Sequence, residues 1–232
     1  MVFKREKQKL FKWRISYLIK TILIRFIGIN LTTRLLLNIS WISGRLAFET
    51  CGQVFGDEFR NGALGLNSDN LLSLISRSDS VLDVGCGTGR WSEIVAEKAK
   101  KVVGIDYDST NIAIANGRGC NAEFKLLDIN DGMKDLGKFN VAILIHLLEH
   151  IDNPQVLLAS LRSNCESLII EVPDRDSNPL NWARIKMGLD YYTDADHVRE
   201  YSVGELREDL EKSGWHEFDY QCVGGSIIAK VK

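Results

Sequence analysis

The sequence predicts an α/β fold in which helices pack on a mainly parallel sheet. From Ser80 onward, short apolar runs alternate with helical stretches, which is the pattern of consecutive βαβ units. The run Val141–Ile145 is apolar throughout, as a strand buried on both faces should be. Glycines at alternate positions follow the first apolar run, and parallel sheets commonly bind ligands at such a turn.

The expected strands follow these apolar runs in order along the chain. They cover Ser80–Val84, Lys101–Asp106, Glu123–Leu127, Val141–Ile145 and Leu168–Val172. The expected helices between them cover Gly89–Lys98, Ser109–Asn116 and Pro154–Leu161. A later helix over Val203–Ser213 ends at Gly214. Beyond it, two strands joined by Gly224-Gly225 should form a closing hairpin, over Trp215–Val223 and Ser226–Val231.

Length and composition describe an ordinary globular protein of one domain with a modest appendage. The 232 residues are 45% apolar and 26% charged with only three prolines, which excludes a disordered chain. The five cysteines are scattered and form no C-x-x-C pair, so neither a disulfide framework nor a cysteine zinc site is indicated. We therefore expect a reducing, cytoplasmic location.

The start of the chain is strongly basic. Residues 1–48 contain ten Lys or Arg and a single acidic residue, Glu6, although the net charge of the whole chain is −2. This asymmetry points to an anionic partner, either a membrane surface or a nucleic acid. The stretch from Ile15 to Phe48 is rich in Ile, Leu, Phe and Trp, which is too apolar for a surface that follows phosphates. Nucleic acid is therefore the disfavoured partner.

The same stretch carries charges too often to cross a bilayer. Lys20 and Arg25 break it well below the ~18 apolar residues that a spanning helix needs, and it does not have the pattern of a secretory signal. We expect one or two amphipathic helices instead. Two interpretations remain open: the helices lie in the interface on the inner face of an anionic membrane, or they cap the substrate cleft and pack as core.

The turn after the first strand has the chemistry of a site for a charged cofactor. Gly85, Gly87 and Gly89 let the chain bend sharply and let a ligand touch its backbone. The helix that starts there directs free N–H groups at the same place, which favours a carboxylate or a phosphate. Asp83 adds a negative charge two residues before the first glycine, and this charge attracts an amino acid ammonium but repels a pyrophosphate.

Two further aspartates follow the next two strands. Asp106 ends the second expected strand, 19 residues after Gly87, where a carboxylate can accept hydrogen bonds from both hydroxyls of a ribose. It could instead cap the following helix. Asp128 lies just beyond the third strand and could accept from an adenine amino group, or it could be an ordinary loop aspartate.

These blocks resemble class I S-adenosylmethionine-dependent methyltransferases. The matching segments are VLDVGCGTG at 81–89, GIDYD at 104–108, LLD at 126–128, VAILIHLLEHIDNP at 141–154 and DHVREYSVGELREDLEKSGW at 196–215. The resemblance runs from about residue 56 to the end and is closest to the small-molecule branch that contains quinone, lipid and sugar O-methyltransferases. The first 55 residues contain no matching motif.

The resemblance implies a Rossmann-like, doubly wound sheet of seven strands with an antiparallel last strand. This domain would cover residues 56–232, after a basic helical arm over residues 1–55. The implied cofactor is S-adenosylmethionine, with its methionine part near the glycine loop, its ribose on Asp106, and its adenine on Asp128 and the backbone of Ile129. The full set of implied cofactor residues is Asp83, Gly85, Cys86, Gly87, Asp106, Tyr107, Asp128, Ile129 and His146.

Histidines are the candidates for catalysis. Methyl transfer from a sulfonium needs the acceptor and the methyl group held in line and dry, without a protein nucleophile. A hydroxyl acceptor is helped by a general base, usually histidine. We place His146 first, for catalysis or acceptor contact, because it follows the fourth strand. His197 comes second and lies in Pro173–Ser202, a segment expected to form a lid over the acceptor; it could instead cap the next helix.

The other two histidines have weaker claims. His150 lies four residues after His146 and would face the same way in a helix, with Glu149 directed elsewhere. Because the sequence shows no third ligand, we expect no metal site. His216 starts a late strand and is expected to be structural.

Two other classes of function compete with methyl transfer. An NAD-dependent oxidoreductase also needs a glycine loop and a ribose carboxylate, but its G-x-G-x-x-G fingerprint is not matched and Asp83 is badly placed for a pyrophosphate. A scaffold that binds the cofactor without catalysis, tethered to a membrane by residues 1–48, would also keep Asp83 and Asp106. We expect methyl transfer to a small or lipid-linked acceptor.

Overall fold

The structure is a computed structural model. It describes the backbone of residues 2–133 and 136–232 and the side chains of residues 13–56, 69–130, 132–133 and 136–232. The chain divides into two compact units. One, the arm unit, comprises the residues up to Val54 together with Pro179–Tyr191. The other, the sheet unit, comprises Phe55–Asn178 and Tyr192–Lys232.

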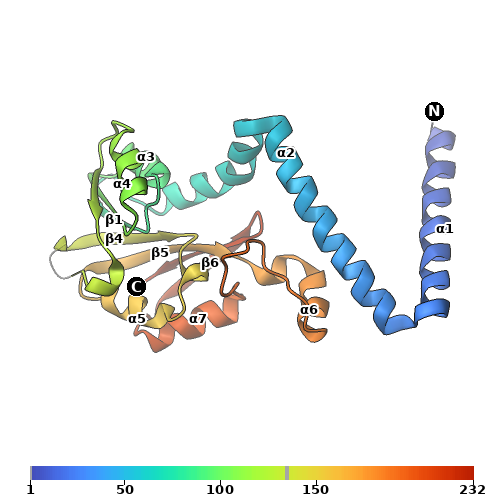
Figure 1. Cartoon of the computed structure of the whole chain (residues 1–232). Coiled ribbons are helices and arrows are strands. Elements are labelled where there is room, and N and C mark those ends of the chain that lie inside the picture. The colour runs from blue at the N-terminus through green and yellow to red at the C-terminus, as the bar shows by residue number, and fades with distance from the viewer. Residues whose placement is uncertain (1, 134–135) are drawn as a thin grey trace. The chain divides into compact units, whose positions relative to one another are not determined.

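A seven-stranded sheet of order β3-β2-β1-β4-β5-β7-β6 forms the centre of the sheet unit (Figure 1). Its strands are β1 Ser80–Val84, β2 Lys101–Asp106, β3 Glu123–Leu126, β4 Phe139–Ile145, β5 Cys165–Pro173, β6 Phe218–Val223 and β7 Ser226–Val231. Strands β1 to β5 pair in parallel, whereas β7 is antiparallel to both β5 and β6. The expected mainly parallel sheet with an antiparallel last strand is confirmed.

Strands β4 and β5 are longer than the apolar runs that predicted them. Phe139 pairs with Cys165 at one end of this ladder, before either apolar run begins. At the other end, Pro173 of β5 pairs with Ser226 of β7. Pairing with neighbouring strands sets these ends, and a neighbour distant in sequence leaves no local signal.

Helices connect the strands as expected. They are α3 Arg90–Ala96, α4 Ser109–Asn116, α5 Pro154–Leu161 and α7 Val203–Lys212, with short 3-10 turns η1 Ile129–Asp131, η3 Leu148–His150 and η4 Arg175–Ser177. Asp108 caps α4 by accepting a hydrogen bond from the N–H of Thr110 (2.7 Å). Ser202 and Glu205 form a reciprocal capping box at the start of α7.

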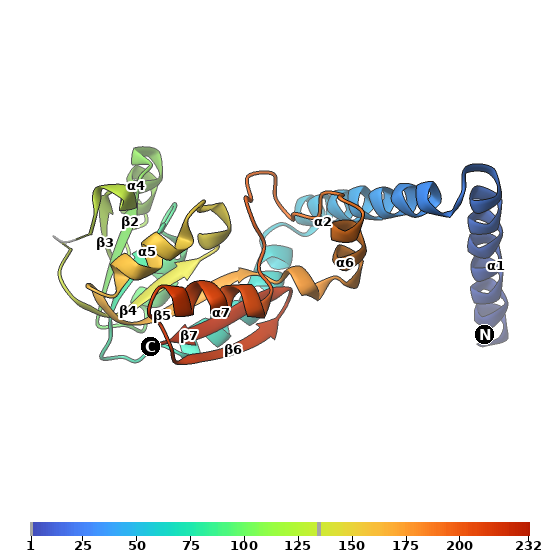
Figure 2. The same cartoon turned by 90° about the horizontal axis from the view of Figure 1, so that it is seen from below.

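Each face of the sheet has its own apolar core, because alternate residues of a strand point to opposite faces. Leu82 and Val84 of β1 join the core that contains α5 and α7. Val81 joins the other core, which contains Val95 of α3 and Leu71 near the end of the long helix α2. Figures 1 and 2 show α5 and α7 together on one face of the sheet. Helices therefore cover both faces, as a doubly wound sheet requires.

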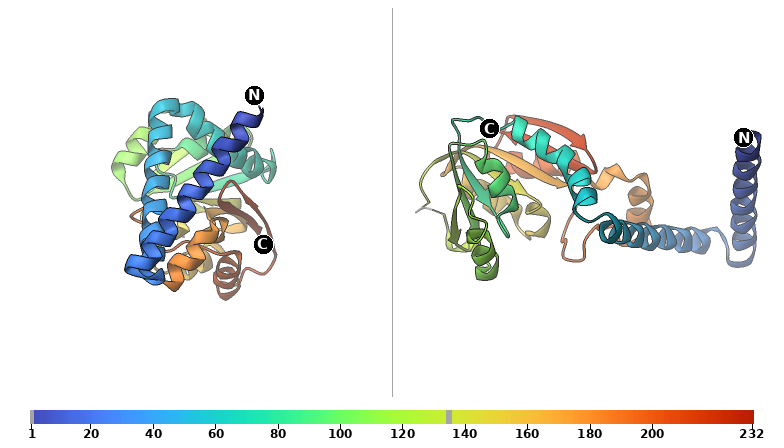
Figure 3. Two further views of the ribbon diagram at one scale, coloured as in Figure 1. Left: turned by 90° about the vertical axis from the view of Figure 1, so that its right-hand side faces the viewer. Right: turned by 90° about the horizontal axis from the view of Figure 1, so that it is seen from above.

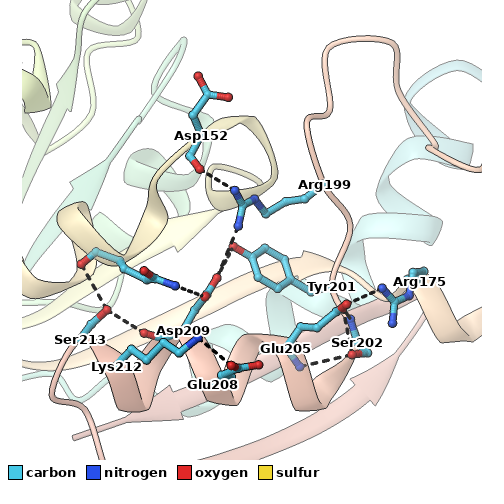
Figure 4. A network of polar contacts seen from close by, with 11 residues as sticks. Asp152, Arg175, Arg199, Tyr201, Ser202, Glu205, Glu208, Asp209, Lys212 and Ser213 are labelled. Atoms are coloured by element: carbon cyan, nitrogen blue, oxygen red, sulfur yellow. Dashed lines mark hydrogen bonds and ion pairs between the residues drawn. The ribbon is translucent and has the colours of Figure 1, made fainter.

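A polar network fixes the segment that precedes α7 (Figure 4). Arg199 donates to the carbonyl of Asp152 (2.6 Å) and lies 3.6 Å from the carboxylate of Asp209 in α7. Asp209 also accepts hydrogen bonds from the Tyr201 hydroxyl (3.3 Å) and the Gln155 amide (2.7 Å). Charge-assisted bonds of this kind hold the segment against both α5 and α7.

The arm unit begins with helix α1 (Val2–Ile27) and contains the first part of α2 (Ile29–Ser73). Gly28, with φ +79°, separates the two helices. Gly56 interrupts α2 with φ 54° and ψ −131°, a conformation outside the helical region. The helices extend on both sides of Ile15–Phe48, the stretch from which they were predicted.

Many apolar side chains of the arm unit are exposed, among them Trp13 (67%) and Phe26 (79%). In α1 the apolar residues from Trp13 to Ile27 lie on all sides of the helix, so the expected amphipathic pattern does not hold for α1. In the described part of the chain, every helix falls short of the length and apolar character that a bilayer-spanning segment needs.

Helix α6 (Pro179–Lys186) belongs to the arm unit and lies beside the first half of α2 (Figures 2 and 3). Its Arg184 is 3% exposed and donates to the carbonyl of Leu37 (2.7 Å). In return, Arg34 of α2 donates to the carbonyl of Met187, just after α6 (2.6 Å). Part of the segment expected to form a lid is therefore bound within the arm unit.

Candidate active site

The glycine loop lies between the end of β1 and the start of α3. Gly85, Gly87 and Gly89 all have positive φ (71°, 51° and 79°), a backbone region that residues with a Cβ rarely adopt. The N–H groups of Gly85 and Cys86 both donate to the carbonyl of Ile105 in β2 (2.9 Å each). The loop is therefore held against the end of β2.

At two of these positions, Gly85 and Gly89, neighbouring side chains leave no room for a Cβ, whereas the middle glycine, Gly87, faces open space. A Cβ on Gly85 would lie 2.8 Å from the side chain of Leu147, and one on Gly89 would lie 2.8 Å from the ring of Phe124. A Cβ on Gly87 would have no described atom within 4 Å beyond its own neighbours in the chain. Gly87 is thus the place where a ligand can approach the backbone of the loop.

Asp106 joins the glycine loop to the end of β2. Its Oδ2 accepts from the N–H of Gly87 (2.9 Å), and its Oδ1 accepts from the N–H of Asp108 (2.9 Å) and from Nδ2 of Asn111 (3.4 Å). A carboxylate has about four acceptor positions, so Asp106 can still accept from a ligand. The cap of the following helix is Asp108, which rules out the capping interpretation of Asp106.

Asp83 is buried at the end of β1, with 2% of its surface exposed. Its Oδ2 accepts a hydrogen bond from the hydroxyl of Ser92 (2.6 Å), a partner that no sequence pattern marks. Burial raises the pKa of Asp83 to about 7, and the charge of Asp106 adds to the rise while the bond from Ser92 opposes it. Burial also raises the pKa of the Cys86 thiol to about 12, so this thiol stays neutral.

The remaining expected cofactor residues are less constrained. Tyr107, directly after β2, is 77% exposed. Asp128 caps η1, because its Oδ1 accepts from the N–H and the Nδ2 of Asn130 (2.9 and 2.8 Å). Ile129 is partly buried against the core that contains α5 and α7. Asp128 thus acts as a cap in a loop, through its Oδ1 alone. The capping bonds do not use its Oδ2, which can accept from a ligand.

His146 follows the last residue of β4 and alone among the described non-glycine residues has positive φ (50°). Its Nδ1 lies 3.0 Å from Oε1 of Glu149, and its Nε2 lies 3.5 Å from Oε1 of Glu171. Both glutamates are fully buried. Burial lowers the pKa of His146, but the hydrogen bonds and charges of the two glutamates outweigh this effect and raise the pKa to about 10.

The two carboxylates favour the protonated form of His146, whereas a general base must be unprotonated, so the role expected from the sequence stays a prediction. An imidazole whose pKa is well above neutrality keeps its proton at pH 7, and both of its ring nitrogens already face carboxylates. The expectation that Glu149 points elsewhere is wrong, because its Oε1 lies 3.0 Å from Nδ1 of His146. Glu171 could not be predicted as a partner of His146 because it lies on the neighbouring strand β5, distant in sequence.

The structure also brings together two histidines that are distant in sequence. The rings of His150 and His197 lie 4.8 Å apart at 73°. Nδ1 of His197 lies 3.1 Å from Oε1 of Glu200, and both side chains are buried. His197 does not cap α7, since Ser202 does. His216 is exposed and lies outside this group.

This sheet order, with its antiparallel strand β7, its glycine loop, and acidic residues at the ends of β1 and β2, is the fold of the class I S-adenosylmethionine-dependent methyltransferases. The chain belongs to the methyltransferase domain family, whose family model matches residues 57–216. The family inferred from the motifs and the fold class are both confirmed.

Two relatives of known name match parts of the chain. Over 93 residues it is 34% identical to the ubiquinone biosynthesis O-methyltransferase of Coxiella burnetii, a match that covers 38% of each chain. Over 127 residues it is 31% identical to the O-antigen chain terminator bifunctional methyltransferase/kinase WbdD of Escherichia coli, covering 49% of this chain and 18% of that one. The chain thus matches well under two thirds of either relative.

Solved structures share the fold at lower identity. The DhpI-SAM-HEP complex superposes with a TM-score of 0.61 and 20% identity, covering 83% of this chain and 97% of that chain. Magnesium protoporphyrin IX methyltransferase from Synechocystis PCC 6803 with bound SAH gives a TM-score of 0.58 and 17% identity, covering 73% and 83% of the two chains. At such identities the likeness establishes the fold.

Proposed function

We propose that this protein transfers the methyl group of S-adenosylmethionine to a hydroxyl group of a small or lipid-linked acceptor. The observation that supports it most directly is the pair of buried carboxylates, Asp83 and Asp106, beside a loop whose middle glycine, Gly87, is open to a ligand. Negative charge there attracts the ammonium and sulfonium groups of this cofactor and repels the pyrophosphate of NAD. No observation in the described residues favours an oxidoreductase.

The proposed cofactor contacts follow the order of the strands. The open backbone at Gly87 would lie against the methionine part, with Asp83 supplying the charge that favours its ammonium group. Asp106 would use its remaining acceptor capacity, about one of four positions, for the ribose. Asp128 and Ile129 are assigned to adenine. The other assigned residues border these parts and are Gly85, Cys86, Tyr107 and His146.

The names of the relatives support an oxygen acceptor. One is an O-methyltransferase of ubiquinone biosynthesis, and the other is a methyltransferase/kinase that terminates O-antigen chains. The first of these names states transfer to an oxygen atom. We therefore assign the acceptor to this chemical range and not to nucleic acid.

We further propose that the protein works as a peripheral protein on the inner face of an anionic membrane, with the arm unit as the contact. Residues 1–48 contain ten basic residues against one acidic residue. Basic residues near such a surface contribute about 1 kcal/mol each, and exposed apolar side chains can enter the interface. The exposed apolar side chains of the arm include Trp13, Tyr17, Phe26, Ile29, Leu46 and Phe48.

Binding and labelling experiments test the proposed cofactor and reaction. Titration calorimetry should detect binding of S-adenosylhomocysteine and none of NAD. A labelled methyl group should pass from the cofactor to a component of a lipid or metabolite extract, which gains one CH₂ by mass spectrometry. Binding of NAD in place of S-adenosylhomocysteine would contradict the proposed cofactor. Cofactor binding with no label transfer to any extract would favour the scaffold.

Reversing three charges of α1 should weaken binding to vesicles that contain phosphatidylserine by about 100-fold or more, given ~1 kcal/mol for each basic residue lost. The variant carries Arg14→Glu, Lys20→Glu and Arg25→Glu, all at exposed positions. Vesicle sedimentation measures the bound fraction. Vesicles of phosphatidylcholine alone should bind both proteins weakly, because they lack the anionic charge.

A matched control separates a local effect of the arm from an effect of net charge. It carries Lys100→Glu, Lys101→Glu and Lys232→Glu, which make the same change in charge at exposed positions of the sheet unit. The control should bind vesicles like the unmodified protein. Equal losses in the two variants, or no loss in the α1 variant, would remove the arm as the membrane contact.

A further inference from the structure

Three potential metal ligands meet beyond the end of β4, next to the site described above. Glu149 and His150 come from the η3 turn, and His197 comes from the segment before α7. One ligand atom from each residue lies within 4.8 Å of those of the other two. The three side chains therefore lie close together although they come from two distant segments of the chain.

The strongest sign of a missing partner is the carboxylate of Glu149, which is fully buried. Its Oε1 faces Nδ1 of His146 at 3.0 Å. Its Oε2 has no hydrogen-bond partner among the described residues. Leaving a buried carboxylate oxygen without a partner is costly, and no described residue donates a hydrogen bond to this one.

The two histidines present the nitrogens that a metal needs. Nδ1 of His197 lies 3.1 Å from the buried carboxylate of Glu200, and Nδ1 of His150 lies 3.3 Å from the carbonyl of Asp196. Each Nδ1–H can therefore donate to an oxygen, which leaves each Nε2 as an acceptor. Metal-binding histidines commonly have this second hydrogen bond, which fixes the ring and its tautomer.

The backbone holds the two segments in register. The N–H groups of Val198 and Arg199 both donate to the carbonyl of Glu149 (2.9 and 3.3 Å). Arg199 is anchored in turn by the network of Figure 4, through Asp152 and Asp209. The backbone of the two segments is therefore fixed in the folded chain, with the three side chains close together.

We propose that Glu149, His150 and His197 bind one divalent transition-metal ion of the Zn²⁺ type. Two imidazoles and one carboxylate suit such an ion better than Mg²⁺ or Ca²⁺, which prefer oxygen ligands. Three protein ligands leave a coordination position open for water or substrate. The sequence analysis expected no metal site because it found no third ligand. The structure places His197 next to Glu149 and His150 as that third ligand.

The role of the ion, unlike its binding, rests on the proposed function. Leu147, which packs against Gly85 of the glycine loop, directly precedes the η3 turn that carries Glu149 and His150. An acceptor hydroxyl in the open coordination position would lose its proton to solvent more readily. Its oxygen would then bond to the methyl carbon, and the C–S bond would break with its electron pair kept by sulfur.

Metal binding is tested on the full chain after removal of metals with a chelator. Calorimetric titration with Zn²⁺ should show a single equivalent per chain, and Co²⁺ should give visible absorption bands of a site with nitrogen ligands. The variants His197→Ala and His150→Ala should weaken Zn²⁺ binding by about 100-fold or more, since each removes a direct ligand. His216→Ala removes an exposed histidine outside the cluster and should bind Zn²⁺ like the unmodified protein.

The test also separates this proposal from the methyltransferase proposal. Binding of S-adenosylhomocysteine reports on the glycine loop and should survive in His150→Ala and His197→Ala, which also shows that they are folded. No Zn²⁺ binding by a chain that binds S-adenosylhomocysteine would overturn the metal site alone. Equal Zn²⁺ affinity in the cluster variants and His216→Ala would overturn it as well. A chain that binds Zn²⁺ but no S-adenosylhomocysteine would keep the metal site and refute the proposed cofactor.

Discussion

Replacing Asp106 with alanine should weaken binding of S-adenosylhomocysteine by about 10- to 100-fold, because hydrogen bonds to a charged group contribute on the order of 1–3 kcal/mol. The change removes the proposed acceptor for the ribose hydroxyls. It also removes the acceptor for the N–H of Gly87, so the glycine loop loses its tie to β2. Affinity should therefore fall more than the loss of one ligand contact alone would cause.

Asp108→Ala is the matched control for Asp106→Ala. Asp108 is the cap of α4, so its loss should cost about 1 kcal/mol of stability and leave the affinity for S-adenosylhomocysteine unchanged. Titration calorimetry gives the affinities, and thermal melts give the stabilities. If the two variants lost affinity equally, Asp106 would act through the fold of this region and not on the cofactor.

Replacing Asp83 with asparagine should stabilise the protein without ligand and weaken its binding of the cofactor. The buried carboxylate has a pKa of about 7, against an ordinary value of 3.8. Since a tenfold change in an ionisation constant corresponds to about 1.4 kcal/mol, the charged form of Asp83 costs the folded chain several kcal/mol at pH 8. Asparagine avoids this cost and still accepts a hydrogen bond from Ser92, but it lacks the charge that attracts the cofactor.

The sign of the pH dependence follows from proton binding. Between about pH 4 and pH 7 the folded chain keeps a proton on Asp83 that the unfolded chain has released, so the contribution of Asp83 to stability falls as the pH rises through this window. The gain in stability from Asp83→Asn should therefore be small at pH 5 and largest at pH 8. The cofactor affinity of the unmodified protein should increase as Asp83 ionises near pH 7, while the stability of the protein without ligand falls.

Thermal melts at pH 5 and pH 8, each with and without S-adenosylhomocysteine, measure both effects. Ser92→Ala is the control, because it keeps the charge of Asp83 and removes its hydrogen bond (2.6 Å). This variant should lose stability at pH 8, where Asp83→Asn gains it. A loss of stability in Asp83→Asn at pH 8 would show that the charged form of Asp83 does not destabilise the folded chain.

Much of the sheet unit could be predicted because its signals are local. A continuous apolar run marks β4, and alternate glycines mark the turn after β1, so these elements and the position of Asp106 follow from a few adjacent residues. The carboxyl ends of parallel strands meet at one edge of a sheet, which is why Asp83 and Asp106 could be assigned to one site without a structure.

The residues around His146 could not be predicted, because their partners come from other parts of the chain. Glu171 reaches it from the neighbouring strand, and Glu149 reaches it from the η3 turn, whose course after β4 no local pattern predicts. The electrostatic setting of His146 could not be predicted for this reason, since the carboxylates that face its ring are not adjacent to it in sequence. His197 likewise meets His150 only after the segment before α7 is fixed against Glu149.

The packing of α6 on α2 bears on how the protein can be shortened for recombinant production. Arg184 is buried by its bonds to Leu37 and Asn38, and Arg34 is bonded to Met187. Deleting residues 1–48 would remove the partners of Arg184 and expose its guanidinium to solvent, although Arg184 is far from the deletion in sequence. Low activity or aggregation of the truncated protein would therefore result from the exposure of α6 as well as from the loss of a membrane contact. Charge reversals at exposed positions of α1 keep α6 packed and test the membrane contact alone.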